Sequence, residues 1–166
     1  MRTEEKIGLL LKGSGLTLSA AESCTGGNIS HLITTVSGSS NYYLGSVTSY
    51  AISVKESILG VPPATINDNG VVSSEVAAAM AEGVRRLTGS TFAVSTTGLA
   101  EGSDGHYPEG TVWIGVSGPQ GTSTLLYQCE GSRTSNIRRF TTAALHFLEK
   151  YITNYLNHYN LNNKTK

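Results

Sequence analysis

A strand, a glycine turn and a helix follow one another in residues 16–36, and this unit constrains the fold more than any other part of the chain. An apolar run over 16–21 predicts the strand, and apolar residues at helical spacing predict a helix within 22–36. The turn between them carries two candidate nucleophiles, Ser23 and Cys24, followed by two glycines. Backbone N–H groups at a helix start have no intrahelical acceptor and favour negative charge. The turn therefore predicts an anion-binding or catalytic site, although glycine turns with capping residues are also common without any such function.

Length and composition indicate one domain and exclude several kinds of partner. The chain has 166 residues, with 12 basic and 12 acidic side chains and a formal net charge of zero, so no overall field attracts nucleic acid or an anionic membrane. No apolar stretch reaches the roughly 18 residues of a membrane span. Two cysteines, Cys24 and Cys129, cannot form a disulfide framework, and no metal-ligand spacing is present. We expect a cytoplasmic protein without nucleic-acid or membrane partners, folded as one domain over 1–157 with a frayed tail at 158–166.

Alternating strand and helix patterns predict an α/β domain with a largely parallel sheet. In such sheets ligands bind outside the carboxyl ends of the parallel strands, which should bring 22–27, 50–55 and 97–110 together. A hairpin over 111–129 adds at least one antiparallel strand. The pattern predicts strands at 16–21, 43–51, 91–95, 111–117 and 122–129, helices at 3–12, 22–36, 54–59, 73–88 and 133–157, a turn-rich segment at 64–72 and a polar, glycine-rich loop at 98–110.

The segment Ala21-Glu22-Ser23-Cys24-Thr25-Gly26-Gly27 resembles the signature of the CinA C-terminal domain family, a domain that also occurs alone as nicotinamide-nucleotide amidohydrolase. The resemblance covers residues 5 to 150 in one consistent order, and we expect the stand-alone form of the domain. The further matching motifs are Gly38-Ser39-Ser40, Tyr50 with Lys55, Leu59-Gly60-Val61, Gly70-Val71-Val72-Ser73, Met80-Ala81-Glu82-Gly83, Thr97-Gly98-Leu99-Ala100 and Gly110-Thr111-Val112.

The resemblance implies a three-layer α/β/α sandwich with a mixed, mostly parallel sheet of five to six strands. It implies hydrolysis of the carboxamide of nicotinamide mononucleotide to nicotinate mononucleotide and ammonia, without metal or organic cofactor. Ser23 would be the nucleophile, assisted by Lys55 and Tyr50. An arginine near the start of the last helix would meet the phosphate of this small-molecule substrate; Arg138 is favoured over Arg133. The other implied substrate-binding residues are Cys24, Thr25, Gly26, Gly27, Thr97 and Gly98.

The chemistry of amide hydrolysis sets conditions that these residues must meet. A serine hydroxyl needs a base, and a lysine acts as one only when burial lowers its pKa. Apolar neighbours such as Val54 and Ile58 would help to bury Lys55, and Tyr50 would orient the lysine or relay a proton. Backbone N–H groups after Ser23 would hold the oxyanion. A dyad of Cys24 and His31 is the alternative nucleophile and base.

One departure from the family pattern concerns the loop after Thr97-Gly98. The family usually carries Ala-Gly-Pro-x-Gly there, whereas this chain has an acid, Glu101, and no proline over 100–105. Such an acid would repel an anionic nucleotide unless it points away or pairs with an arginine. Hydrolysis of another small amide and a nucleotide-binding module without catalysis are therefore alternative functions.

The last predicted helix also bears on assembly. Its apolar stripe and the tyrosines at 151, 155 and 159 would either form a subunit contact or cover the sheet. A homo-oligomer is expected on the first of these two readings.

Overall fold

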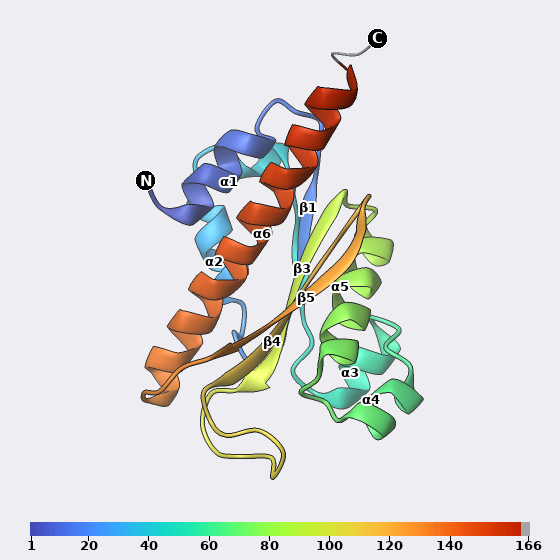
Figure 1. Ribbon diagram of the computed structural model, residues 1–166, viewed down its shortest axis with the longest axis vertical. Coiled ribbons are helices and arrows are strands. Elements are labelled where there is room, and N and C mark those ends of the chain that lie inside the picture. The colour runs from blue at the N-terminus through green and yellow to red at the C-terminus, as the bar shows by residue number, and fades with distance from the viewer. Residues whose placement is uncertain (164–166) are drawn as a thin grey trace.

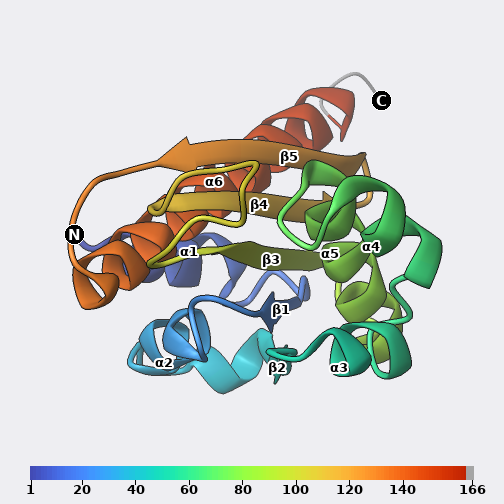
Figure 2. The same cartoon turned by 90° about the horizontal axis from the view of Figure 1, so that it is seen from below.

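A five-stranded mixed sheet forms the centre of the molecule, in the order β2-β1-β3-β4-β5 (Figure 1, Figure 2). Strands β1 (Leu18–Glu22), β2 (Tyr43–Thr48) and β3 (Phe92–Leu99) are parallel to one another. Strands β4 (Thr111–Gly118) and β5 (Gly121–Gln128) form a hairpin, and β4 joins β3 in antiparallel register. The expected mixed sheet is confirmed: three parallel strands, β1, β2 and β3, are extended by the antiparallel hairpin of β4 and β5.

Helices cover both faces of this sheet. The structure, a computed structural model, describes the backbone of residues 1–163 and the side chains of residues 1–159. The helices are α1 (Thr3–Leu11), α2 (Asn28–Thr34), α3 (Ile52–Ser57), α4 (Pro63–Asn69), α5 (Ser74–Thr88) and α6 (Arg133–Asn163), with one 3₁₀ turn, η1 (Ser39–Asn41). Helices α1, α2 and α6 lie on one face and α3, α4 and α5 on the other (Figure 1), which confirms the three-layer α/β/α arrangement.

The central strands are buried because each of their faces packs against helices. Every residue of β1 is buried, and successive side chains of a strand point to opposite faces. Leu18 and Ala20 accordingly join the core beneath α1, α2 and α6, whereas Ala21 joins the core beneath α5. In β3, Val94 likewise belongs to the first core and Ala93 to the second. The sheet therefore separates two apolar cores.

Helix α5 approaches the chain after α3 very closely. Ser73 is the N-cap of this helix, and its hydroxyl accepts a hydrogen bond from the N–H of Val76. Inside the helix, a Cβ added at Gly83 would lie 2.0 Å from the carbonyl oxygen of Leu59. Only glycine permits this approach, which holds the α3–α4 region against the sheet.

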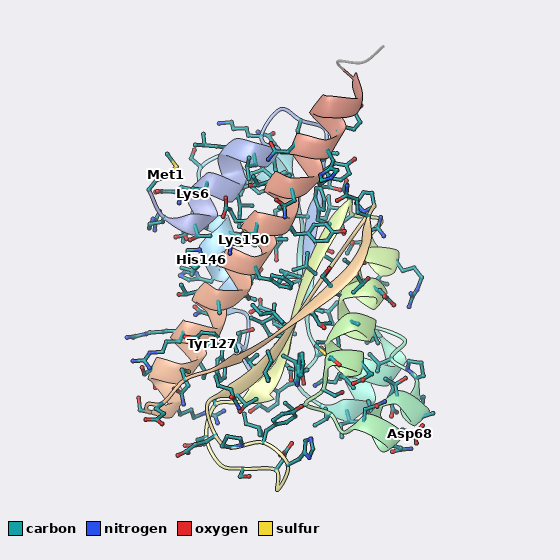
Figure 3. The ribbon with its side chains drawn as sticks, viewed as in Figure 1. Met1, Lys6, Asp68, Tyr127, His146 and Lys150 are labelled. Carbon is teal, nitrogen blue, oxygen red and sulfur yellow. The ribbon has the colours of Figure 1, made fainter. Side chains whose placement is uncertain are left out.

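Several predicted boundaries were wrong. The turn-rich segment 64–72 is in fact helix α4, which begins with proline at its first turn and ends at Gly70 with φ +82°. Burial of Ile66 stabilises this short helix against its polar composition, and Asp68 lies on its outer side (Figure 3). The helix predicted within 22–36 begins only at Asn28, because Gly26 and Gly27 have positive φ and extend the turn.

The strands and the last helix also differ in length from the prediction. Strand β2 ends at Thr48 and not at 51, whereas β3 continues through Leu99 because its far end pairs with Thr111 of β4. Helix α6 continues to Asn163, so residues 158–163 of the expected tail are helical. Residues 164–166 of that tail lie outside the described residues.

Helix α6 covers the sheet along its length. Tyr151 and Tyr155 pack edge-to-face on Phe92, with ring centroids 6.1 and 5.3 Å away, and the Tyr151 hydroxyl donates to the carbonyl oxygen of Gly121. These two tyrosines thus contact the sheet, as in one of the two expected alternatives. Further along, His146 lies beside α1 (Figure 3). In the described part of the chain, no helix has the length and apolar character to cross a membrane.

Candidate active site

The carboxyl ends of β1 and β3 and the segment after β2 meet at a cavity of about 270 Å³. The turn after β1 contributes Ser23 and Cys24, the first turns of α3 contribute Lys55, and the end of β3 contributes Thr97 and Gly98. The three segments that the parallel-sheet rule groups together therefore do lie side by side. The polar loop 100–110 extends from the same end of the sheet (Figure 1).

Ser23 and Lys55 form a side-chain pair at the bottom of this cavity. Lys55 Nζ donates a hydrogen bond to Ser23 Oγ over 2.9 Å. The lysine is 1% exposed and the serine 9% exposed. The Ser23 N–H donates to the carbonyl oxygen of Thr96 in β3 over 3.2 Å, which fixes the start of the turn. A serine and an amine at this distance can exchange a proton.

Backbone carbonyl groups hold Lys55 in place. Its Nζ also donates to the carbonyl oxygens of Ser49, over 2.6 Å, and Tyr50, over 3.1 Å. The segment is itself anchored, because the Ser49 N–H donates to the carbonyl oxygen of Glu22 over 2.8 Å. Burial lowers the pKa of Lys55 below its ordinary value of 10.5. Ile58, expected to shield the lysine, is instead 49% exposed.

The carboxylate of Glu22 binds the backbone N–H groups at the start of helix α2. This carboxylate is fully buried and accepts hydrogen bonds from the backbone N–H groups of Ile29 and Ser30 and from the hydroxyl of Thr25. The N–H groups of the first helical turn, expected to be free for an anionic ligand, therefore bind the chain's own carboxylate. Charge at a helix N-terminus is favourable, so Glu22 stabilises the turn that carries Ser23.

Two backbone N–H groups next to Ser23 remain available. Those of Cys24 and Thr25 donate to no backbone group of another residue within residues 1–159, and they belong to the turn directly after Ser23. The Cys24 thiol itself is a weak acid, because desolvation raises its pKa to about 12. His31, the expected partner of Cys24 in the alternative dyad, is exposed on α2. The geometry thus gives the serine a hydrogen-bonded base, Lys55, and does not support His31 as a base for the cysteine.

A second group of polar side chains lies at the rim of the cavity. Arg133 is the first residue of α6, and its Nη2 donates to the Tyr50 hydroxyl over 3.2 Å while its Nη1 donates to Glu101 Oε1 over 3.2 Å. Tyr50 is 64% exposed. Its phenol does not contact Lys55 in the described structure; its carbonyl group does. Glu101, which was expected either to point away or to pair with an arginine, pairs with Arg133.

Other residues implied by the resemblance lie beside the cavity rather than in its wall. Among the described side chains, the wall includes Arg133 but not Arg138, which is exposed farther along α6. Thr25 turns inward, where its hydroxyl lies 2.8 Å from that of Thr96. Gly26 and Gly27 shape the turn through their positive φ angles and do not line the cavity within the described part of the chain.

Some residues that build the site were not identified from sequence. Asn136 is fully buried and donates to the carbonyl oxygens of Ala100 and Gly131, so it ties the loop after β3 to the start of α6. Thr97, which the sequence had named as a substrate-binding residue, also has a structural contact: its hydroxyl donates to the carbonyl oxygen of Val71 and holds the segment before α5. A buried asparagine just inside a helix that starts with arginine is a usable sequence signal, because a buried amide needs partners.

No cluster of three or more His, Cys, Asp or Glu side chains suitable for a metal ion occurs in the part of the chain that the structure describes. The residues that line the cavity are a serine, a cysteine, a lysine, an arginine and one carboxylate, together with threonine, tyrosine, glycine and apolar residues. These groups can perform nucleophilic and acid–base chemistry.

Comparison with known proteins shows the family of this chain. The sequence model of the CinA C-terminal domain matches residues 1–152. The chain belongs to the CinA C-terminal domain family. A CinA-like protein of Salinibacter ruber is 46% identical over 144 residues, and one of Desulfosudis oleivorans is 44% identical over 153 residues. The matches cover 86% and 89% of this chain but only 35% and 36% of those proteins, so the chain spans about a third of their length.

Solved structures of CinA proteins share the fold. The crystal structure of competence damage-inducible protein A (ComA) from Klebsiella pneumoniae superposes with a TM-score of 0.87 at 26% identity, covering 92% of this chain and 98% of that one. The structure of competence/damage inducible protein CihA from Agrobacterium tumefaciens gives a TM-score of 0.80 at 30% identity, covering 88% and 93%. The CinA C-terminal fold therefore extends over almost all of this chain.

Proposed function

We propose that this CinA-type domain hydrolyses the carboxamide of nicotinamide mononucleotide to nicotinate mononucleotide and ammonia by a serine–lysine mechanism. The observation that carries the proposal is the buried contact of 2.9 Å between Lys55 Nζ and Ser23 Oγ at the bottom of the cavity. Membership of the CinA family supports the choice of this amide, through the resemblance of its signature residues.

The hydrogen bonds of Lys55 suit a general base. A neutral amine has two N–H donors and one lone pair. In the neutral amine, the carbonyl oxygens of Ser49 and Tyr50 take both N–H donors. The contact with Ser23 Oγ, in which the ammonium form donates, then reverses, and the hydroxyl donates to the amine lone pair. Desolvation favours this neutral form, because it lowers the lysine's pKa. General-base assistance of this kind contributes about 10²- to 10⁴-fold in rate.

The reaction then proceeds in two steps, formation of a serine ester and its hydrolysis. Lys55 accepts the Ser23 proton as Oγ attacks the amide carbon, and the N–H groups of Cys24 and Thr25 donate to the resulting oxyanion. When the C–N bond breaks, the lysine ammonium gives its proton to the leaving nitrogen, which departs as ammonia. Water then attacks the serine ester, Lys55 accepts its proton and returns one to Ser23 Oγ, and the carboxylic acid leaves.

The rim supports recognition of the phosphate. Arg133 is the cation that lines the cavity nearest to solvent in the described part of the chain, and a guanidinium binds phosphate oxygens through parallel hydrogen bonds. Bound at Arg133, the phosphate would direct the nicotinamide ring toward Ser23. No metal or organic cofactor takes part in the proposed steps.

Ammonia release from nicotinamide mononucleotide by the wild type, Ser23→Ala and Ser57→Ala, with EDTA present, tests the proposal. Ser57 is a matched control, because it is an exposed serine at the end of α3. We expect turnover by the wild type and Ser57→Ala, and a loss of about 10³-fold or more in Ser23→Ala. Full activity in Ser23→Ala would reject the mechanism. Binding without turnover by the wild type would indicate a nucleotide-binding module, and turnover of other amides alone would indicate a different substrate.

A further inference from the structure

Charge at the cavity is divided between its bottom and its rim. In the described part of the chain, the charged side chains that line the cavity are Lys55, Glu101 and Arg133. Lys55 is buried, whereas the side chains of Arg133 and Glu101 are 45% and 63% exposed. With Lys55 neutral, the charges of Arg133 and Glu101 cancel, and the site offers no net positive charge to an anionic substrate.

The guanidinium of Arg133 is already occupied. One nitrogen donates to the Tyr50 hydroxyl and another to a single oxygen of Glu101, each over 3.2 Å. An exposed ion pair with one such contact is weak, because water solvates both charges. A phosphate carries about −1.5 to −2 charges and three strong acceptor oxygens, against one charge on a carboxylate. A phosphate can therefore replace Glu101 on this arginine.

The backbone, and not the ion pair, keeps Glu101 at this position. The preceding residue, Ala100, is fixed by its carbonyl oxygen, which accepts a hydrogen bond from the buried amide of Asn136 over 2.9 Å. The other two acids of the loop accept hydrogen bonds from backbone N–H groups of the same loop: Asp104 from those of His106 and Tyr107, and Glu109 from that of Gly102. Glu101 is thus the acid of this loop that lines the cavity.

We propose that Glu101 is a specificity-determining residue, because its carboxylate occupies on Arg133 the place that the phosphate of the substrate must take. This inference rests on the proposed function. It identifies the phosphate as the part of the substrate that Arg133 and Glu101 discriminate. Glu101 weakens binding of phosphorylated amides, which must displace it and then lie near its charge. It leaves binding of the corresponding unphosphorylated amides unchanged, since these do not need Arg133.

The test compares nicotinamide mononucleotide with nicotinamide riboside, which lacks the phosphate, in the wild type, Glu101→Gln and Glu130→Gln. Glu130 is a matched control: it is exposed, lies three positions before Arg133, and its side chain does not line this cavity in the described structure. We expect Glu101→Gln to lower KM for the mononucleotide by roughly threefold to tenfold at unchanged kcat. The KM for the riboside, and both KM values in Glu130→Gln, should stay at their wild-type values.

Inorganic phosphate supplies a second measurement that needs no turnover. Calorimetric titration should give a lower Kd for phosphate in Glu101→Gln than in the wild type and in Glu130→Gln. Equal phosphate affinities, an equal shift for both amides, or the same shift in Glu130→Gln would overturn the inference. If the wild type hydrolyses neither amide, the proposed function fails, and the phosphate titration alone then supports or rejects the role of Glu101.

Discussion

Lys55 Nζ lies closer to the carbonyl oxygen of Ser49, at 2.6 Å, than to the hydroxyl of Ser23, at 2.9 Å. The lysine is therefore oriented by the backbone, and its direction does not depend on the nucleophile. Because the Ser49 N–H in turn donates to the carbonyl oxygen of Glu22, the end of β1 sets the position of the amine. The base and the nucleophile are thus positioned by adjacent strands, which makes their separation a property of the fold.

The rate of hydrolysis should rise with pH through the lowered pKa of Lys55. Only the neutral amine can accept the Ser23 proton, and burial shifts this ionisation below 10.5. We expect kcat/KM to increase about tenfold per pH unit below that pKa and then to level off. A pH profile of ammonia release measures this. The residual activity of Lys55→Met should lack the rise, whereas Lys150→Met, which changes an exposed lysine of α6 (Figure 3), should keep it.

The stability of the fold should depend on the same ionisation. In the unfolded chain Lys55 has its ordinary pKa of 10.5, so between the lowered pKa and 10.5 the unfolded state binds more protons than the folded state. The free energy of unfolding should therefore rise with pH across that window and stay level below the lowered pKa, where both states bind the proton. Urea unfolding at a series of pH values measures this contribution. An unchanged pH slope in Lys55→Met would contradict it.

Cys24 should be dispensable as a nucleophile. Its thiol pKa of about 12 leaves almost no thiolate near neutral pH, and alkylating reagents react with the thiolate. We expect Cys24→Ala to retain most of the activity, and brief treatment of the wild type with iodoacetamide to leave ammonia release intact. Loss of activity in both experiments would favour the cysteine as nucleophile. His31→Ala, at an exposed position, should also remain active.

The position of the site could be predicted from sequence because it follows from the direction of the chain. Three apolar runs, each followed by a turn, predict parallel strands whose carboxyl ends meet, and the structure brings 22–27, 50–55 and 97–110 together. Helix α4 could not be predicted, since its polar sequence becomes helical only through burial of Ile66 against α5. Strand β3 was predicted too short for a related reason: its last residues pair with β4, a contact between distant segments.

The details of the site depend on contacts that local patterns do not contain. Which of Arg133 and Arg138 lies at the cavity depends on where α6 begins, and of these two described arginines it is Arg133, the first residue of the helix, that lines the cavity. The free N–H groups predicted for the start of α2 are bound by Glu22, a residue of the signature that received no role. The pairing of Glu101 joins positions 32 residues apart, so sequence left both of its orientations open.

Removal of the Glu22 carboxylate should loosen the turn that carries Ser23. Glu22→Ala leaves the N–H groups of Ile29 and Ser30 buried without an acceptor, which costs about 1–3 kcal/mol for each unsatisfied group. We expect a lower urea midpoint and a lower kcat, because Ser23 follows Glu22 directly. Glu82→Ala is the matched control on the exposed face of α5 and should change neither value. An unchanged midpoint in Glu22→Ala would contradict a stabilising role.

Arg133 and Arg138 offer a direct comparison of two arginines on one helix. Arg133 lines the cavity and contacts Tyr50, whereas Arg138 is exposed and outside the cavity wall in the described structure. If Arg133 binds the substrate phosphate, Arg133→Ala should raise KM for nicotinamide mononucleotide by about tenfold or more, since a charge-assisted contact is lost. The kcat should change less, because the serine–lysine pair is untouched. Steady-state kinetics with Arg138→Ala as control measures both values, and a larger rise of KM in Arg138→Ala would assign the phosphate to Arg138 instead.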